Sequence, residues 1–142
     1  MIYRCIIAEY LYLCGMQGSF TFGKSERLSY KSAIEDLFHK GSGIPCYPLR
    51  IVWLAREGEE GCKPRILVSV PARTFRKAVD RNLLKRRMRE AYRRNKIRLS
   101  GRLPFSNRQV DIAFLYIAKE ICSYHDIEKG ILSGLDAVAE RV

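Results

Sequence analysis

The stretch that decides the fold is residues 69–93, SVPARTFRKAVDRNLLKRRMREAYR, where a strand ends at a proline and a long helix follows. At about 100° per residue the pattern predicts a helix over Arg76–Leu99 with two distinct faces. The apolar residues of one arc are Leu84, Met88, Ala91 and Tyr92. The polar residues of the adjoining arc are Asn82, Lys85, Arg86, Arg89 and Arg93, with Arg81 at the border. One side of this helix can therefore dock on a sheet while the next side presents cations.

The same stretch carries the positive charge of the whole protein. The chain has 142 residues and a net charge of +11, and 47% of its residues are hydrophobic, which excludes a disordered basic tail. Residues 72–108 hold 14 of the 26 Lys and Arg residues and only two acidic ones, Asp80 and Glu90. The rest of the chain is close to neutral. A charge gathered in one segment indicates a binding surface for a polyanion, nucleic acid first and an anionic membrane second.

The residues before this stretch predict one helix and two strands. A helix is expected over Ser29–Lys40, capped by Ser29 and stopped by Gly41, followed by a turn region over 41–48. Leu49–Arg56 and Arg65–Val70 have the branched and aromatic composition of strands. The residues between them, 57–64, are expected to form a hairpin loop.

The residues after it predict a loop over 101–109, a strand and a final helix. Val110–Ala118 is almost continuously apolar, which is typical of a central strand covered on both faces. Ser123–Asp126 resembles a capping box, and the helix behind it has an apolar stripe. The residues of that stripe are Ile127, Ile131, Leu135 and Val138. The order of elements predicts a single α/β (α+β) sandwich of one sheet and about three helices over residues 19–142, with 1–18 as an extension outside the fold.

Two groups of residues are candidate sites of chemistry. Arg81, Lys85 and Arg89 follow at i, i+4 and i+8 and begin a cationic ridge about 18 Å long, which can meet several phosphates of a nucleic acid. Asn82 beside them suits a base edge or a sugar hydroxyl. The five cysteines contain no C-x-x-C pair and only two histidines accompany them, which argues against a zinc site or a disulfide framework and for a reducing cytosol.

A family resemblance runs through this basic stretch. Its pattern is Ala78-Val79-x-Arg81-Asn82-x-x-Lys85-Arg86-x-x-Arg89-Glu90-x-x-Arg93, with Ser69-Val70 just before it. Upstream stand Phe22-x-Lys24-x-x-Arg27-Leu28 and Phe38-x-x-Gly41. These motifs, in this order and spacing over about residues 20–140, closely resemble the protein subunit of bacterial ribonuclease P.

The resemblance implies a function and a fold. The catalyst of this family is an RNA that uses Mg²⁺ to hydrolyse the phosphodiester 5′ to the mature tRNA. The small basic protein binds the catalytic RNA and the 5′ leader of precursor tRNA, raises affinity for substrate and magnesium, and contains no catalytic residue or metal ligand of its own. It acts as a monomer within a cytoplasmic holoenzyme. The implied fold is a two-layer sandwich around a central mixed sheet, with a left-handed β-α-β crossover.

The resemblance also implies which side chains bind RNA. Its RNA-contacting motif falls on part of the basic helix, and Arg73, Lys77 and Arg93 extend it. The RNA-binding residues are therefore Arg73, Lys77, Arg81, Asn82, Lys85, Arg86, Arg89 and Arg93. The cleft for the leader falls on Tyr30, Ile34 and Phe38. Ile34 stands where many members have an aromatic, and Leu83 replaces one cation of the family triplet.

Other classes of protein fit these residues less well. A ribosomal or other general structured-RNA-binding protein is the main alternative, because it would carry a similar basic helix. A helix-turn-helix DNA-binding module is disfavoured by the strands on both sides of the basic helix. A nuclease would need clustered carboxylates or a histidine acid near the basic segment, and a membrane-surface helix would need a wider apolar arc.

Overall fold

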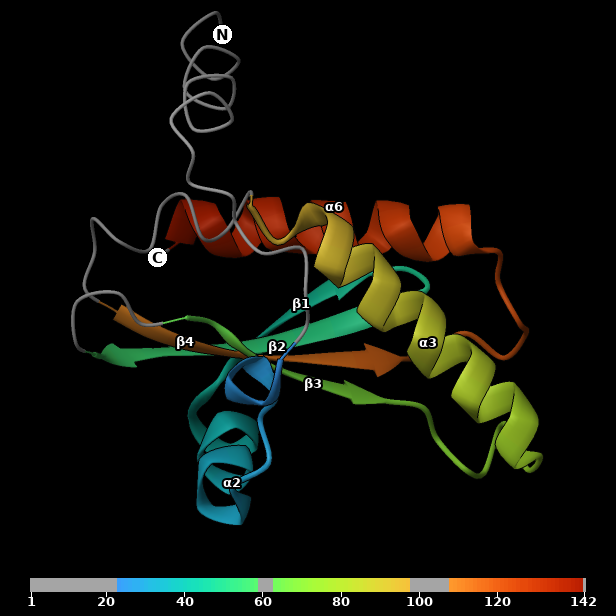
Figure 1. The fold of residues 1–142 in the computed structure, drawn as a ribbon, viewed down its shortest axis with the longest axis horizontal. Coiled ribbons are helices and arrows are strands. Elements are labelled where there is room, and N and C mark those ends of the chain that lie inside the picture. The colour runs from blue at the N-terminus through green and yellow to red at the C-terminus, as the bar shows by residue number, and fades with distance from the viewer. Residues whose placement is uncertain (1–22, 59–62, 98–107, 142) are drawn as a thin grey trace, which may run out of the picture.

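A mixed sheet crosses the middle of the protein, with helices on both of its faces (Figure 1). The computed structural model describes residues 23–58, 63–97 and 108–141. The strands are β1 (Ser42–Cys46), β2 (Leu49–Glu57), β3 (Arg65–Ser69) and β4 (Arg108–Tyr116). The helices are the short 3₁₀ helix η1 (Lys24–Glu26), α2 (Lys31–Lys40), α3 (Ala78–Asn95) and α6 (Tyr124–Arg141). These elements confirm the α+β class with a mixed sheet and three α-helices in the described residues. The extension 1–18 and most of the loop 101–109 lie outside them.

Strand β4 lies inside the sheet, whose order is β1-β2-β4-β3. It pairs antiparallel with β2 and parallel with β3, and its residues from Val110 to Phe114 are buried. This confirms the prediction of a central strand, because a nearly continuous apolar run is stable only where both faces are covered. The expected hairpin between β2 and β3 is wrong. These two strands are not neighbours, since the more apolar β4 lies between them.

The region 41–48 contains a strand that the sequence did not predict. Residues Ser42–Cys46 form β1 and pair antiparallel with Leu49–Trp53. The residues Gly43 and Pro45 have low strand propensity and hide this strand from a reading of local composition. A proline is tolerated here because β1 lies at the edge of the sheet, where an N–H is not always needed.

The structure shows how well the sequence predicted the starts of α2 and α6. The N-cap of α2 is Tyr30, and no side chain caps the helix, so the prediction that Ser29 caps it is wrong by one position. Helix α6 shows the serine half of its expected capping box. The backbone N–H of Asp126 donates to Ser123 Oγ at 3.3 Å, and the Ser123 hydroxyl donates to the Asp126 carboxylate at 3.1 Å. Two residues of α6, Gly130 and Gly134, lie directly against β1 and β2, where a Cβ on Gly134 would meet the side chain of Ile51.

Successive side chains along each strand point to opposite faces of the sheet and form two cores, one on each face. The larger core holds the apolar faces of α3 and α6, and the four stripe residues of α6 are completely buried in it. The smaller core lies under α2 and consists of Leu28, Ala33, Leu37, Val52 and Ala113. The two-layer sandwich thus describes the sheet with α3 and α6, and α2 adds a short layer on the opposite face (Figure 1).

The connection from β3 through α3 to β4 sets where α3 lies. Both strands run in the same direction, and α3 crosses the sheet face that α6 also covers (Figure 1). In Figure 1, α3 lies above the sheet, β3 and β4 point to the right, and β3 is nearer to the viewer, so the β3-α3-β4 crossover is left-handed. The family resemblance implied this handedness, which is against the usual right-handed rule. The consequence is that α3 lies over the β3 edge, and one long side of it faces away from the sheet.

A buried carboxylate on β4 joins three strands of the sheet. Asp111 on β4 is completely buried and accepts hydrogen bonds from Arg65 at 2.7 and 2.9 Å and from Arg56 at 2.9 Å. These arginines come from the strands on either side of β4. One charge in the centre therefore ties three strands together, and it is compensated by two guanidinium groups.

Candidate nucleic-acid interface

Helix α3 has the two faces that its sequence predicted. Leu84, Met88, Ala91 and Tyr92 are completely buried against the sheet and α6. On the polar arc Asn82, Arg86 and Arg89 are exposed, whereas Arg81, Lys85 and Arg93 are half-buried. The apolar arc therefore fixes the orientation of α3 and with it the side of the helix that faces the solvent.

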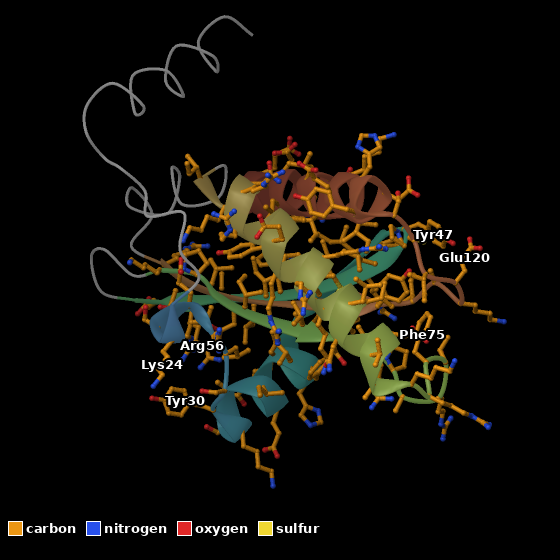
Figure 2. The ribbon with its side chains drawn as sticks, turned by 45° about the vertical axis from the view of Figure 1, so that its right-hand side comes forward. Lys24, Tyr30, Tyr47, Arg56, Phe75 and Glu120 are labelled. Carbon is orange, nitrogen blue, oxygen red and sulfur yellow. The ribbon has the colours of Figure 1, made fainter. Side chains whose placement is uncertain are left out.

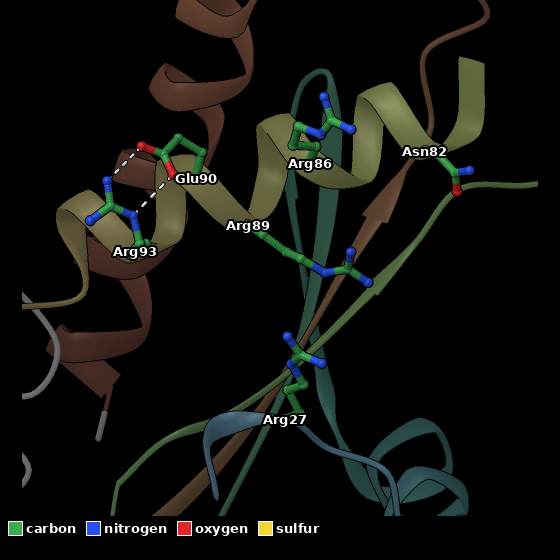
Figure 3. A pocket seen from close by; sticks show the side chains of 6 residues that line it. All are labelled: Arg27, Asn82, Arg86, Arg89, Glu90 and Arg93. Atoms are coloured by element: carbon green, nitrogen blue, oxygen red, sulfur yellow. Dashed lines mark hydrogen bonds and ion pairs between the residues drawn. The ribbon is translucent and has the colours of Figure 1, made fainter. Parts of the chain in front are cut away.

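A cationic pocket lies beside the exposed arc of α3. Its volume is about 420 Å³, and it is lined by Arg27, Asn82, Arg86, Arg89, Glu90 and Arg93 (Figure 3). Arg27 comes from the segment just after η1, and the other five residues come from α3. Four guanidinium groups thus face one small open space that contains a single carboxylate. Such a concentration of positive charge favours a polyanion over a neutral or cationic ligand.

The single carboxylate of the pocket is turned toward its own helix. Arg93 donates to both Glu90 oxygens, at 2.9 and 2.6 Å, and Arg94 approaches the same group at 3.3 Å. The hydrogen bonds from Arg93 hold the pKa of Glu90 below its ordinary value, so the charged form of the carboxylate is favoured. Glu90 therefore neutralises the Arg93 end of the pocket. No such partner is found for Arg86 or Arg89 among the residues the structure describes.

Arg81 does not point into the pocket. Its guanidinium donates to the backbone carbonyls of Phe75 at 2.8 Å and Arg76 at 2.9 Å, in the loop before α3. Phe75 in turn packs edge-on against Tyr116, with 5.5 Å between the ring centroids. Arg81 thus holds the loop that carries two other predicted RNA-binding residues, Arg73 and Lys77, both of which are exposed. These two, like Lys85, lie outside the pocket.

The three predicted leader-cleft residues lie along one flank of α2. The side chain of Tyr30 points outward beside α2 (Figure 2). Tyr30 is 68% exposed and Phe38 is 47% exposed, while Ile34 packs against the core under α2. At one helical turn apart they form a continuous strip of apolar and aromatic surface. Phe38 belongs to neither core cluster, so its ring is available for contact with a partner. None of the three lines the cationic pocket.

Arg27 and Glu90 are the pocket residues that the sequence did not predict at the site, and Arg27 is the one outside the basic helix. It stands in the upstream motif with Lys24 and Leu28, far from the basic stretch, so local charge gave no reason to select it. Arg27 forms a parallel bridge with Ile66 of β3, and the N–H of Leu28 donates to the carbonyl of Ile66 at 2.9 Å. The presence of Arg27 in a motif with family spacing was the available signal.

The side chains of the pocket do not fit a magnesium ion. Mg²⁺ prefers oxygen ligands in an octahedral arrangement, and the only carboxylate here is occupied by two arginines. In the described parts of the chain no three His, Cys, Asp or Glu residues are placed to hold a metal ion. Cys46 and Cys122 are free thiols, and the other three cysteines lie outside those parts.

No helix within the described ranges is long and apolar enough to cross a membrane.

The α+β fold and the arginines gathered beside α3 define a class of small basic protein shaped for a polyanion. Comparison with known sequences narrows the class. The ribonuclease P family model matches residues 22–129. A ribonuclease P protein component of Porphyromonas gingivalis is 36% identical over 124 residues, which is 86% of this chain and 90% of the relative. That of Chlorobaculum tepidum is 38% identical over 96 residues, 63% of this chain and 62% of the relative. The chain belongs to the ribonuclease P protein family.

Solved structures agree with this at the level of the fold. The ribonuclease P protein of Thermotoga maritima superposes with a TM-score of 0.63 at 23% identity, over 79% of this chain and 96% of that one. The protein of Staphylococcus aureus gives 0.62 at 18% identity, over 82% of this chain and 97% of that one. The arrangement of sheet and helices is therefore shared although most side chains differ.

Proposed function

We propose that this chain is the RNA-binding protein subunit of a bacterial ribonuclease P and assists removal of the 5′ leader from precursor tRNA. The observation that carries the proposal is the exposed arc of α3, where Asn82, Arg86 and Arg89 line one pocket while the adjoining apolar arc is buried in the core. Guanidinium groups bind phosphate oxygens through paired hydrogen bonds, which suits an RNA backbone. Membership of the family identifies which RNA this is: the catalytic RNA of ribonuclease P.

The charges of the site indicate which steps the protein performs and which the RNA performs. The pocket offers cations for RNA phosphates and no free carboxylate for a metal, so we assign bond cleavage and the binding of Mg²⁺ to the RNA. The strip formed by Tyr30, Ile34 and Phe38 is assigned to the 5′ leader, with Phe38 and Tyr30 offering faces for base stacking. We further propose that one copy of the chain binds each catalytic RNA, in the cytoplasm.

The test adds the protein to the ribonuclease P RNA of the same organism and a precursor tRNA at low magnesium. Cleavage is expected to accelerate with the wild-type chain. The double variant Arg86→Ala, Arg89→Ala is expected to lose at least about tenfold in this stimulation, since each charge-assisted hydrogen bond contributes roughly 1.5–3 kcal/mol. Lys129→Ala, which removes an exposed cation from α6, is the matched control.

Three results would count against the proposal. A wild-type chain that binds the RNA without accelerating cleavage would indicate a general structured-RNA-binding protein. A chain that cleaves precursor without any RNA would indicate a protein nuclease. Equal stimulation by the double variant and the control would remove α3 from the interface.

A further inference from the structure

Two apolar side chains on the outer side of α3 take no part in either core. Val79 is 77% exposed, more than any other large hydrophobic residue in the described ranges, and Leu83 is half-buried. Neither belongs to the cluster under α2 or to the cluster that holds the apolar arc of α3. They stand four residues apart, so they are neighbours on the helix surface. Packing within the two cores therefore does not explain this apolar pair.

The apolar pair lies on the same strip of α3 as two residues of the cationic pocket. Val79, Asn82, Leu83 and Arg86 follow at i, i+3, i+4 and i+7, which is one side of a helix. Asn82 and Arg86 line the pocket (Figure 3), and Val79 lies in the first turn of the helix beyond it. The apolar pair therefore continues the surface that is proposed to bind RNA.

Exposed cations precede the apolar pair in the chain as well as following it. The loop before α3 presents Arg73, Arg76 and Lys77, all of which are exposed. In chain order the apolar pair thus lies between these cations and Arg86. A cationic partner would be repelled by both groups, and a membrane surface would need a wider apolar arc. The surroundings favour a polyanion that has apolar surface of its own.

RNA is a polyanion of this kind. Each phosphate is joined to a ribose that carries a base, and proteins bind unpaired nucleotides by covering the apolar faces of these groups. At 1.5 Å per residue, Arg86 lies about 4.5 Å along the helix axis from Leu83 and about 10 Å from Val79. Arg86 can therefore hold a phosphate while the apolar pair covers the sugar or base beside it.

We propose that Val79 and Leu83 form an apolar contact with the ribose or base of one nucleotide of the catalytic RNA, next to a phosphate bound by Arg86. The inference rests on the proposed function, which assigns α3 to the catalytic RNA and the strip on α2 to the leader. It adds two uncharged binding residues to that interface. The family resemblance places a cation at position 83, so Leu83 exchanges one phosphate contact for an apolar one in this chain.

The salt dependence of RNA binding separates an apolar contact from a charge contact. The double variant Val79→Thr, Leu83→Gln keeps the approximate size of both side chains and makes them polar. It is expected to bind ribonuclease P RNA about tenfold more weakly, because less apolar surface is buried, with an unchanged slope of log K against log salt. Ile121→Gln, at an apolar residue that is 44% exposed outside α3, is the matched control and should bind like wild type. Wild-type affinity in the double variant, or a slope that falls together with its affinity, would refute the contact.

Two further probes identify what the apolar pair touches. Inorganic polyphosphate has charge and neither sugar nor base, so the double variant should bind it as tightly as wild type, whereas Arg86→Ala should bind it more weakly. A loss of polyphosphate binding in the double variant would overturn the contact. Precursor tRNA is the second probe, and its affinity for the holoenzyme assembled at saturating protein should not change. A loss confined to precursor tRNA would overturn the assignment to the catalytic RNA.

The reverse exchange tests position 83 directly. Leu83→Arg is expected to increase the magnitude of the salt slope by about 0.7–0.9, because it supplies one more phosphate contact. A slope equal to that of wild type would place residue 83 outside the interface and refute its part in the contact.

The controls separate this inference from a folding defect and from the proposed function. Both positions lie outside the cores, so the double variant should keep the melting temperature of wild type. If it is unfolded, Val79→Thr alone, which keeps a β-branched side chain, is measured in its place. If the wild-type chain neither binds the RNA nor accelerates cleavage, the proposed function fails. If the wild-type chain does both and the double variant binds equally well, only the apolar contact fails.

Discussion

The salt dependence of RNA binding gives the most direct test of how α3 is used. Among the eight predicted RNA-binding residues, Arg81 is bonded to two carbonyls, Arg93 is paired with Glu90, and Asn82 is neutral. Five cations remain for which the described structure shows no side-chain hydrogen bond or ion pair. They are Arg73, Lys77, Lys85, Arg86 and Arg89.

The expected magnitude follows from this count. Each neutralised phosphate contributes about 0.7–0.9 to the slope of log K against log salt, so five contacts predict a slope of about −3.5 to −4.5. The motif alone, with five or six phosphates, predicts about −4 to −5. Replacing Arg86 and Arg89 by alanine removes two contacts and should reduce the slope by about 1.4–1.8.

The assay is filter binding or fluorescence anisotropy with ribonuclease P RNA at fixed magnesium and varied potassium chloride. The double variant is expected to remain folded, because both side chains are exposed and alanine favours a helix. Its melting temperature is the check on this point. A wild-type slope near zero, or the same slope for wild type and variant, would refute the reasoning that these arginines neutralise phosphates.

Four further outcomes are expected. Arg81→Met should accelerate hydrogen exchange in the loop at Phe75 and Arg76 and leave the salt slope unchanged, because this arginine holds the loop; a slope reduced by one contact would contradict that. Asp111→Asn should lower the free energy of unfolding in urea by about 3–5 kcal/mol, since Arg56 and Arg65 lose their buried counter-charge. Gly134→Ala should cost about 1–3 kcal/mol because its Cβ meets Ile51, whereas Ser133→Ala on the exposed side of α6 should be neutral. Glu90→Gln should be less stable than wild type above pH 4.5, the ordinary pKa of this group, and the difference in melting temperature should vanish as the pH falls through the lower folded value; a difference that persists at pH 2 would contradict the assignment.

Much of the fold could be predicted from local patterns. The two arcs of α3, the Ser123 cap of α6 and the buried run of β4 each depend on side chains within a few turns or residues of one another. Such patterns depend on residues close together in the chain, so the sequence alone displays them. Strand β1 was missed for the same reason, because its Gly43 and Pro45 are poor strand formers and only pairing with β2 makes the segment a strand.

Parts of the site could be predicted in the same way, and parts could not. The exposure of Asn82, Arg86 and Arg89 follows from helical spacing once the apolar arc is known. The direction of the Arg81 guanidinium toward the loop at Phe75 does not, because it depends on how the chain returns from β3 to α3. Charge on a helix face thus indicates which side chains can bind RNA. The neighbouring loop decides which of them are instead hydrogen-bonded within the protein.

By itself the sequence determined that a basic helix would be displayed beside a docking face, and its motif identified the ribonuclease P family. Only the tertiary structure placed β4 between β2 and β3, laid α3 over the β3 edge, and brought Arg27 opposite Arg89. The physical reason is the distance in sequence between the residues that interact. Periodicity and capping are properties of neighbouring residues, whereas the pocket exists because the sheet and the buried Glu26–Lys96 pair join segments far apart in the chain.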